Sequence, residues 1–132
     1  MPTEPTELRR IGVVESPLDD LDAAPKQGRE GGADAWIVLA PEFVDGLDGV
    51  AAGDRLLVLT WLHLGDRDVL RVHPRDDVSN PLRGVFSTRS ASRPNPIGLK
   101  EVEVLEIDGG RLRVAPLEAV DGTPVVDLKP VL

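Results

Sequence analysis

The sequence contains no cysteine and no tyrosine, and only two phenylalanines and two tryptophans among its 132 residues. Without cysteine the chain can form neither a disulfide nor a thiol nucleophile, and cysteine-based zinc fingers are excluded. No apolar run approaches the length of a membrane span, and the opening MPTEPTELRR lacks the apolar core of a signal peptide. These absences predict a soluble, cytoplasmic protein that does not act at a membrane.

The motifs of several large enzyme classes are missing as well. The chain contains no G-x-G, so the dinucleotide fingerprint of a Rossmann fold is absent, as are a P-loop and a G-x-S-x-G nucleophile elbow. The two histidines, His63 and His73, make a poor metal site unaided, and each is more often a partly buried polar residue than a ligand. We therefore expect no metal centre.

What the sequence does have is many short β-rich segments, separated by twelve prolines and thirteen glycines. No window shows a sustained apolar period of 3.6 residues, which argues against a helical bundle. The expected strands cover residues 8–14, 35–39, 55–63, 69–72, 84–88, 99–107, 111–115 and 124–128, with one or two helical turns at 41–47. The expected fold class is therefore mainly all-β, as one domain over residues 1–132 with an antiparallel sheet, barrel or sandwich and little helix.

One local prediction is especially clear. Asp108-Gly109-Gly110 separates two β-rich segments and is typical of a hairpin turn. In the first arm, Val102 and Val104 alternate on one face, but Leu105 then falls on the other. This change of phase predicts either a bulge or a strand buried on both faces.

The charge of the chain is unevenly distributed. The formal net charge is −8, which argues against an indiscriminate nucleic-acid binder. Residues 67–100, however, carry 7 basic against 3 acidic side chains, and the rest of the chain carries 8 against 20. Most of these basic residues are arginines, whose planar guanidinium suits phosphate and carboxylate. The segment is either a solvated surface stretch or an anion-contacting one.

The richest segment is GVFSTRSASRPNPIGL, residues 84–99. Pro94 and Pro96 fix their own backbone angles and push Arg93 and Asn95 into extended conformations, so this segment is not a helix. The result is a stiff ribbon that carries arginines, serines and an amide. Such a pre-organised polar edge suits a ligand site, although a rigid surface loop explains the same residues equally well.

Two further clusters are, by themselves, ordinary turns. They are Asp121-Gly122-Thr123-Pro124 and Pro25-Lys26-Gln27-Gly28. Together with the ribbon, however, the segments resemble the TrmO family, also called TsaA-like or YaeB-like. The resemblance covers nearly the whole chain and is most specific in R-P-N-P-I-G (93–98) and D-G-T-P (121–124); the other matching segments are 11–13, 16–17, 25–27, 56–63, 84–90 and 125–130.

The family consists of S-adenosylmethionine-dependent methyltransferases that act on a modified adenosine, a threonylcarbamoyl adenosine, beside the anticodon of tRNA. The resemblance implies a small antiparallel β-barrel, unlike the Rossmann methyltransferases, that works as a homodimer. It also implies S-adenosyl-L-methionine as the cofactor. The residues that it places at the cofactor are Gln27, His63, Arg89, Leu99, Asp121, Gly122, Thr123 and Pro124.

Methyl transfer to an exocyclic adenine amine requires close, in-line placement and an acceptor for the proton of the amine. Our hypothesis is that Asn95 and Asp121 are the catalytic residues, orienting the amine or the cofactor. Arg93 and Asn95 would contact the substrate, and Arg89 and Arg93 would bind the methionine carboxylate or an RNA phosphate.

The chain departs from the family pattern on what we interpret as the acceptor side. Residues 64–83 are compact, and Ala52-Gly53-Asp54-Arg55 replaces a sequence that is usually aromatic. We also expect no C-terminal extension after Leu132. Two alternatives to tRNA methylation therefore stay open: methylation of a small molecule or nucleoside, and a non-catalytic module that binds S-adenosylmethionine.

Overall fold

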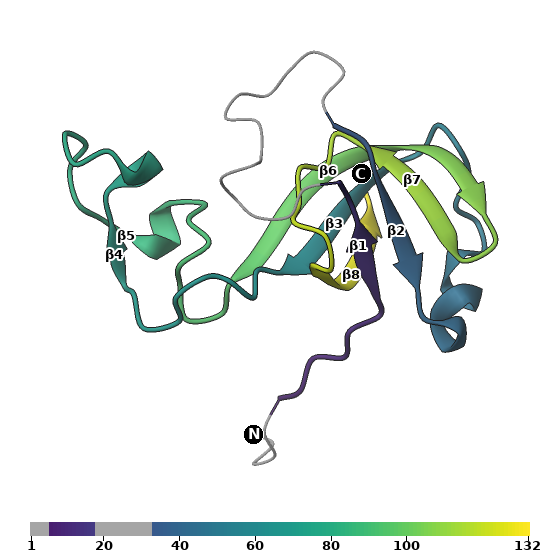
Figure 1. Cartoon of the computed structure of the whole chain (residues 1–132), viewed down its shortest axis with the longest axis horizontal. Coiled ribbons are helices and arrows are strands. Elements are labelled where there is room, and N and C mark those ends of the chain that lie inside the picture. The colour runs from purple at the N-terminus through teal and green to yellow at the C-terminus, as the bar shows by residue number, and fades with distance from the viewer. Residues whose placement is uncertain (1–5, 18–32) are drawn as a thin grey trace.

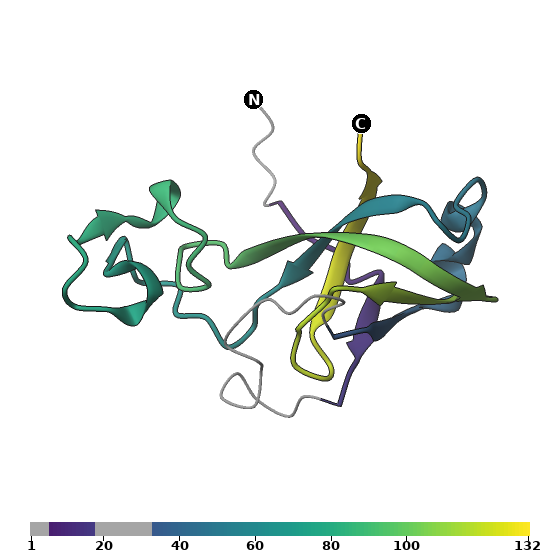
Figure 2. The same cartoon turned by 90° about the horizontal axis from the view of Figure 1, so that it is seen from above.

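A computed structural model describes residues 6–17 and 33–132. Its main body is a closed barrel of six antiparallel strands in the order β1-β2-β7-β6-β3-β8 (Figures 1 and 2). The barrel strands are β1 (Gly12–Glu15), β2 (Ala35–Leu39), β3 (Arg55–Trp61), β6 (Ile97–Asp108), β7 (Arg111–Ala115) and β8 (Pro124–Pro130). The expected mainly β fold with little helix is confirmed.

The barrel closes around an aliphatic core because its strands alternate buried and partly exposed side chains. In β2, Ala35, Ile37 and Leu39 are buried, whereas the residues between them are partly exposed. Alternate residues of a strand point to opposite faces, so this pattern directs one face into the barrel. Burial of each of the larger side chains, Ile37 and Leu39, contributes about 1.5–3 kcal/mol relative to exposure. The buried core cluster consists of Val14, Ala35, Ile37, Leu39, Leu56, Val58, Val102, Val104, Leu112, Val114, Leu117 and Val125.

The predicted hairpin is present, and of the two readings of its phase change the bulge is confirmed. β6 and β7 pair antiparallel, and a two-residue turn joins Asp108 to Arg111. Gly109 has φ +60, a left-handed conformation that glycine adopts without strain. The register shifts between Val104 and Glu106, which leaves Leu105 36% exposed. The bulge therefore explains why apolar residues change face along this strand.

Residues 62–96, which we call the lobe, leave the barrel after β3 and return to it at β6 (Figure 1). Two short strands, β4 (Arg71–Val72) and β5 (Arg83–Gly84), pair within it. The prediction of a strand over residues 84–88 is wrong, because the chain forms a 3₁₀ turn over Val85–Ser87. The Ser87 hydroxyl donates to Gly84 O at 2.8 Å, and the Thr88 hydroxyl donates to Val85 O at 3.0 Å. Such local hydroxyl-to-carbonyl bonds compete with strand pairing.

Strand boundaries elsewhere differ by a few residues. β2 and β7 have the predicted limits, and the predicted helical turns form a 3₁₀ helix over Pro41–Leu47 with proline at its start. β1 begins at Gly12 rather than Leu8, and β3 ends at Trp61 rather than His63. Within the described residues, no helix is long and apolar enough to span a membrane.

Candidate functional site

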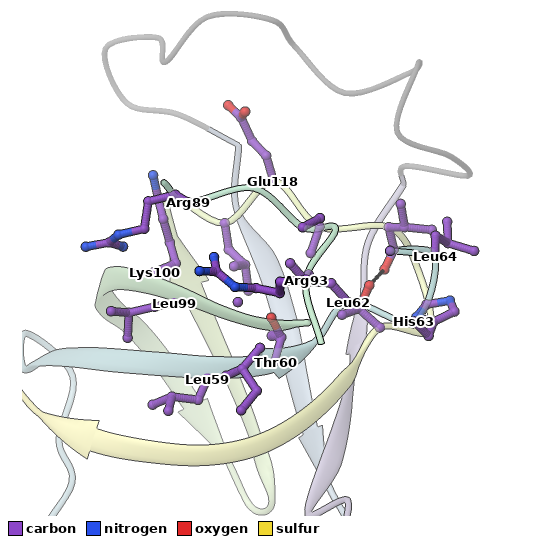
Figure 3. Close-up of a pocket in the computed structure, with 18 of the residues that line it drawn as sticks. Leu59, Thr60, Leu62, His63, Leu64, Arg89, Arg93, Leu99, Lys100 and Glu118 are labelled. Carbon is purple, nitrogen blue, oxygen red and sulfur yellow. Dashed lines mark hydrogen bonds between the residues drawn. The ribbon is translucent and has the colours of Figure 1, made fainter. Parts of the chain in front are cut away.

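A cavity of about 670 Å³ lies where the lobe meets the end of the barrel (Figure 3). Four segments that are distant in sequence form it: the end of β3, the start of β6, the connection between β7 and β8, and the lobe. Its volume is in the range of small-molecule and cofactor sites. The lining residues are Leu59, Thr60, Leu62, His63, Leu64, Gly65, Phe86, Thr88, Arg89, Ala91, Arg93, Ile97, Gly98, Leu99, Lys100, Leu117, Glu118, Ala119, Val120 and Thr123.

The interior of the cavity is mostly apolar, and the pairing of β3 with β6 shapes it. Thr60 lies opposite Gly98 in the register and is 6% exposed. A Cβ atom on Gly98 would overlap the Thr60 hydroxyl and would lie 3.1 Å from a methyl carbon of Leu62. The absence of a side chain at Gly98 therefore leaves room at the point where the two strands enter the cavity.

Arg93 organises the loop that closes one side of the cavity. Its guanidinium donates to Val85 O at 2.6 Å, to Ser90 O at 3.0 Å and to Thr88 O at 3.1 Å. These three bonds satisfy carbonyl groups that a strand or helix would otherwise pair. Arg93 thus fixes the shape of the loop that carries Phe86 and Arg89.

The mouth of the cavity carries charges of both signs. Arg89, Lys100 and Glu118 lie along it, and we call these three residues the rim (Figure 3). Among the described residues, none of the three forms an ion pair or a side-chain hydrogen bond with another. A charged mouth above an apolar interior suits a ligand with an apolar body and a charged end.

The structure brings five of the predicted site residues together around this cavity: His63, Arg89, Arg93, Leu99 and Thr123. Thr123 is 3% exposed, and its hydroxyl donates to Val120 O at 2.6 Å. Leu99 is 44% exposed. Segments separated by tens of residues thus converge, as a shared ligand site requires.

The other predicted residues that the structure describes do not line the cavity. Asn95 is exposed, and its side-chain oxygen accepts a hydrogen bond of 3.2 Å from Arg67, whose guanidinium lies 5.1 Å from the centre of the Trp61 ring. Asp121 accepts a hydrogen bond of 3.0 Å from the Ser16 amide and borders a separate hollow. Gln27 lies outside the described residues.

Gly122 and Pro124 belong to the turn that leads into β8. Gly122 has φ +85, and its amide donates to Val14 O at 2.8 Å. The Val14 amide in turn donates to Thr123 O at 2.9 Å, and Pro124 pairs with Val13. The D-G-T-P segment thus ties β1 to β8 and places Thr123 at the cavity.

Sequence reasoning missed several lining residues, notably Thr60, Phe86, Lys100 and Glu118. Lys100 stands two residues after the R-P-N-P-I-G motif, and Glu118 three residues before D-G-T-P. Their closeness in sequence to the two motifs is a signal that could have identified them as site residues. The position of Thr60 depends instead on strand register, which only the fold supplies.

Two groups away from the cavity have shifted pKa values. The Ser79 hydroxyl and then the Ser79 amide donate to Asp77 and lower the pKa of its carboxyl group. Hydrogen bonds from Arg113 to Asp34 and to Glu106 raise the pKa of the guanidinium. The described residues contain no group of three or more His, Asp or Glu side chains placed to hold a metal ion.

The fold and site define a class of protein: a small closed antiparallel barrel with a lobe, whose cavity is built around R-P-N-P-I-G and D-G-T-P loops. The chain belongs to the TrmO family, since the model of the tRNA-methyltransferase O N-terminal domain matches residues 13–132. The resemblance to this family that the sequence motifs indicated is therefore confirmed.

Individual proteins agree with this assignment. The chain is 49% identical to a probable S-adenosyl-L-methionine-binding protein of Methanothermobacter thermautotrophicus, over 93% of this chain and 88% of that protein. It is 47% identical to an S-adenosyl-L-methionine-binding protein of Archaeoglobus fulgidus, over 92% of this chain and 86% of that protein. A crystal structure of TrmO from Pseudomonas aeruginosa superposes with a TM-score of 0.77 at 30% identity, covering 98% of this chain but 57% of the TrmO chain.

Proposed function

We propose that the cavity binds S-adenosyl-L-methionine and that the protein transfers the methyl group of this cofactor. The observation that carries the proposal is the convergence of both family motifs on one cavity with an apolar interior and a rim of mixed charge. The cofactor has a matching division, with an adenine base at one end, a charged amino acid at the other and the methyl-bearing sulfonium between them. Relatives named as S-adenosyl-L-methionine-binding proteins support this choice.

The proposed chemistry is transfer from a sulfonium to an amine. The bond between the methyl carbon and sulfur breaks, a bond between that carbon and the acceptor nitrogen forms, and the nitrogen loses a proton. S-adenosylhomocysteine leaves as the other product. Such a reaction depends on placement more than on a nucleophilic side chain, which fits a cavity whose loop is held rigidly by Arg93.

We further propose tRNA as the acceptor, at a threonylcarbamoyl adenosine beside the anticodon, in the cytoplasm. The family model and the TrmO crystal structures support a tRNA substrate. The lobe adds a physical argument, because Arg71, Arg75, Arg83 and Arg89 are exposed and form no ion pair with any described residue. Exposed arginines of this kind suit phosphate oxygens.

Asn95 and Asp121 remain our proposed catalytic residues. Asn95→Ala and Asp121→Ala should each lower the methylation rate by about 10²-fold or more, because each would lose a hydrogen-bonding group at the acceptor amine. Both residues are exposed, so the melting temperature should change little. Wild-type turnover in both variants would contradict the assignment.

The decisive experiment is transfer of a labelled methyl group into total tRNA from cells that lack this protein. Nucleoside analysis should then reveal a newly methylated, modified adenosine. If the tRNA stays unlabelled while a nucleoside or metabolite panel is methylated, the acceptor is a small molecule. A wild-type protein that fails to bind the cofactor at all would refute the proposal at its first step.

The cavity also bears on a second candidate, a module that binds S-adenosyl-L-methionine without catalysis. The specific observation in its favour is that Asn95 and Asp121 do not line the cavity and already hold other hydrogen bonds. The names of the relatives describe binding as well. Cofactor binding without turnover on tRNA or on the metabolite panel would identify this candidate.

We propose that the working form is a homodimer. Phe86 is 80% exposed and Leu64 is 58% exposed, although both border the cavity. A second copy that covered these side chains would remove apolar surface from water and would complete the wall of the cavity. Sedimentation should show a dimer that Phe86→Ser dissociates, whereas Val78→Ser, 81% exposed but outside the cavity, should leave it intact. A monomer at all concentrations would contradict this proposal.

A further inference from the structure

A groove of about 900 Å³, which we call the far groove, lies at the end of the barrel away from the lobe. One wall is the 3₁₀ helix that follows β2, on the side of the barrel away from the lobe in Figure 1, and the other is the last part of β8. Phe43, Leu47 and Leu128 line it and are only partly buried, next to the buried core residues Leu39 and Leu56. The far groove therefore presents apolar surface to solvent.

The β8 wall of the far groove is a strand edge that no strand of the described chain covers. β1 pairs with β8 only as far as Val125, whereas β8 continues to Pro130. The Val131 amide donates to Arg55 O on β3 at 3.2 Å. Because hydrogen bonding alternates along an antiparallel pair, the backbone groups of Leu128 and Pro130 point away from β3. Their edge faces the far groove.

At Leu128 and Pro130 this edge can accept hydrogen bonds but has none left to donate. The Leu128 amide already donates to the Asp127 carboxylate at 2.9 Å, and Pro130 has no amide hydrogen. A neighbouring strand would bring carbonyl groups that find no donor here, whereas a guanidinium carries only donors. The edge therefore suits arginine side chains better than it suits a further β-strand.

The charged groups of the far groove also favour a basic ligand. Asp48 and Asp54 line it, are exposed, and form no ion pair with any described residue. The two basic side chains that line it, Arg55 and Lys129, are each already paired with a carboxylate. Two carboxylates are thus available to a cationic partner, and the acidic net charge of the chain would speed its approach.

Phe43 supplies a flat apolar surface on which a guanidinium can stack. The guanidinium of Arg9, from the segment before β1, already lies 5.7 Å from the centre of the Phe43 ring. Attraction between a cation and an aromatic ring favours arginine at such a place over an apolar or acidic side chain. Carbonyl oxygens, free carboxylates and an aromatic ring thus all select for the same side chain.

We propose that the far groove is a docking site for an extended segment of a partner protein that combines arginines with apolar residues. Apolar side chains at every second position of an extended segment pack on Leu47 and Leu128. The long arginine side chains between them reach the Asp48 and Asp54 carboxylates and the carbonyl oxygens of β8. This inference does not depend on the proposed function, because the cavity and the far groove lie at opposite ends of β3.

The test is an NMR titration of the isotope-labelled full chain with a capped heptapeptide in which leucines and arginines alternate. The wild type should bind this peptide with a Kd in the micromolar range. The amide signals of Leu47, Asp48 and Leu128 should shift, while those of the lobe stay in place. A peptide with lysine at every arginine position should bind about threefold more weakly or worse, and one with glutamate there should not bind.

Two double variants test the charges. In Asp48→Asn/Asp54→Asn the affinity for the arginine peptide should fall about fivefold or more, because two charged acceptors become neutral. Asp68→Asn/Asp76→Asn removes the same charge from exposed lobe positions and should bind as the wild type does. All four side chains are exposed, so the melting temperature of each variant should stay close to that of the wild type.

Every other result contradicts the proposal and names what replaces it. Equal binding of the arginine and glutamate peptides would mean that only apolar contact matters. Binding that appears only in Arg9→Ala would mean that the segment before β1 fills the far groove. Binding that appears only when the protein is diluted to a monomer would mean that a second copy covers it. Absence of binding in every form, or equal loss in both double variants, would leave the far groove without this role.

Discussion

The guanidinium of Arg93 is the clearest case of a single side chain whose surroundings only the fold could supply. The sequence predicted a contact with substrate or anion, whereas three hydrogen bonds run from this group to carbonyls of its own loop. Arginine can do this because its planar group presents several donors in fixed directions, which the single ammonium of lysine does not. The R-P-N-P-I-G motif thus contributes to the shape of the cavity as well as to its charge.

A prediction follows from this geometry for Arg93→Lys. The charge is kept but at least two of the three carbonyl contacts are lost, so cofactor affinity should fall by about tenfold or more, close to the loss in Arg93→Ala. Titration calorimetry with S-adenosyl-L-methionine measures both. Arg83→Lys, the same replacement at an exposed lobe position, serves as the control and should bind normally. Retention of full affinity in Arg93→Lys would show that Arg93 acts as a point charge.

Gly98 supports a second prediction at this scale. In Gly98→Ala the new methyl group would collide with the buried Thr60 hydroxyl and press on Leu62, so we expect a loss of about 1–3 kcal/mol in the free energy of unfolding. Gly46→Ala is the matched control, because a Cβ atom there meets nothing within 4 Å. Urea denaturation of both variants measures the difference. Equal stability of the two would contradict the tight approach of β3 and β6 at the cavity.

At the scale of elements, the barrel strands could be predicted and the lobe could not. Residues 35–39 were predicted from a compact apolar run and residues 111–115 from their place after the Asp108-Gly109-Gly110 turn, and both strands have the predicted limits. The strand predicted at 84–88 is mostly a 3₁₀ turn, because hydroxyl groups of Ser87 and Thr88 bond to nearby carbonyls. Hydrophobic pattern contains no information about such local bonds.

The turn at Asp77 in the lobe allows a prediction about pH. The Ser79 hydroxyl and amide lower the pKa of this carboxyl, so its stabilising effect is present above the ordinary value of 3.8 and is lost as the pH falls through the lowered value. In Ser79→Ala the pKa of Asp77 should rise toward its ordinary value. Carbon-detected NMR titration of the Asp77 carboxyl measures it. Ser87→Ala removes a lobe hydroxyl that bonds elsewhere and should leave the titration unchanged.

At the scale of the whole molecule, the sequence named five of the twenty residues that line the cavity but could not place the cavity. His63, Arg89, Leu99 and Thr123 were each tied to a motif, and the barrel brings them together. Asn95 and Asp121 come from the same motifs yet lie outside the cavity, and their catalytic roles stay predictions. Which motif residues share a cavity depends on the register of β3 with β6 and on the path of the lobe, and neither can be read from residue spacing.

The charge distribution of the whole molecule leads to the last prediction. The net charge is −8, yet exposed arginines gather on the lobe next to the cavity, including Arg71 on β4 and Arg83 on β5. If the lobe contacts tRNA phosphates, each contact releases counterions and steepens the fall of affinity with salt. The double variant Arg71→Ala/Arg83→Ala should reduce the slope of log K against log salt by about one to two units while cofactor affinity is unchanged.

The matched control is the double variant Arg55→Ala/Lys129→Ala. It removes two cations at the opposite end of β3, which pair with Glu101 and Asp127, and it should retain the wild-type slope. Equal slopes in wild type and lobe variant would remove the lobe from the tRNA interface and would favour a small acceptor, for which the acidic barrel poses no obstacle.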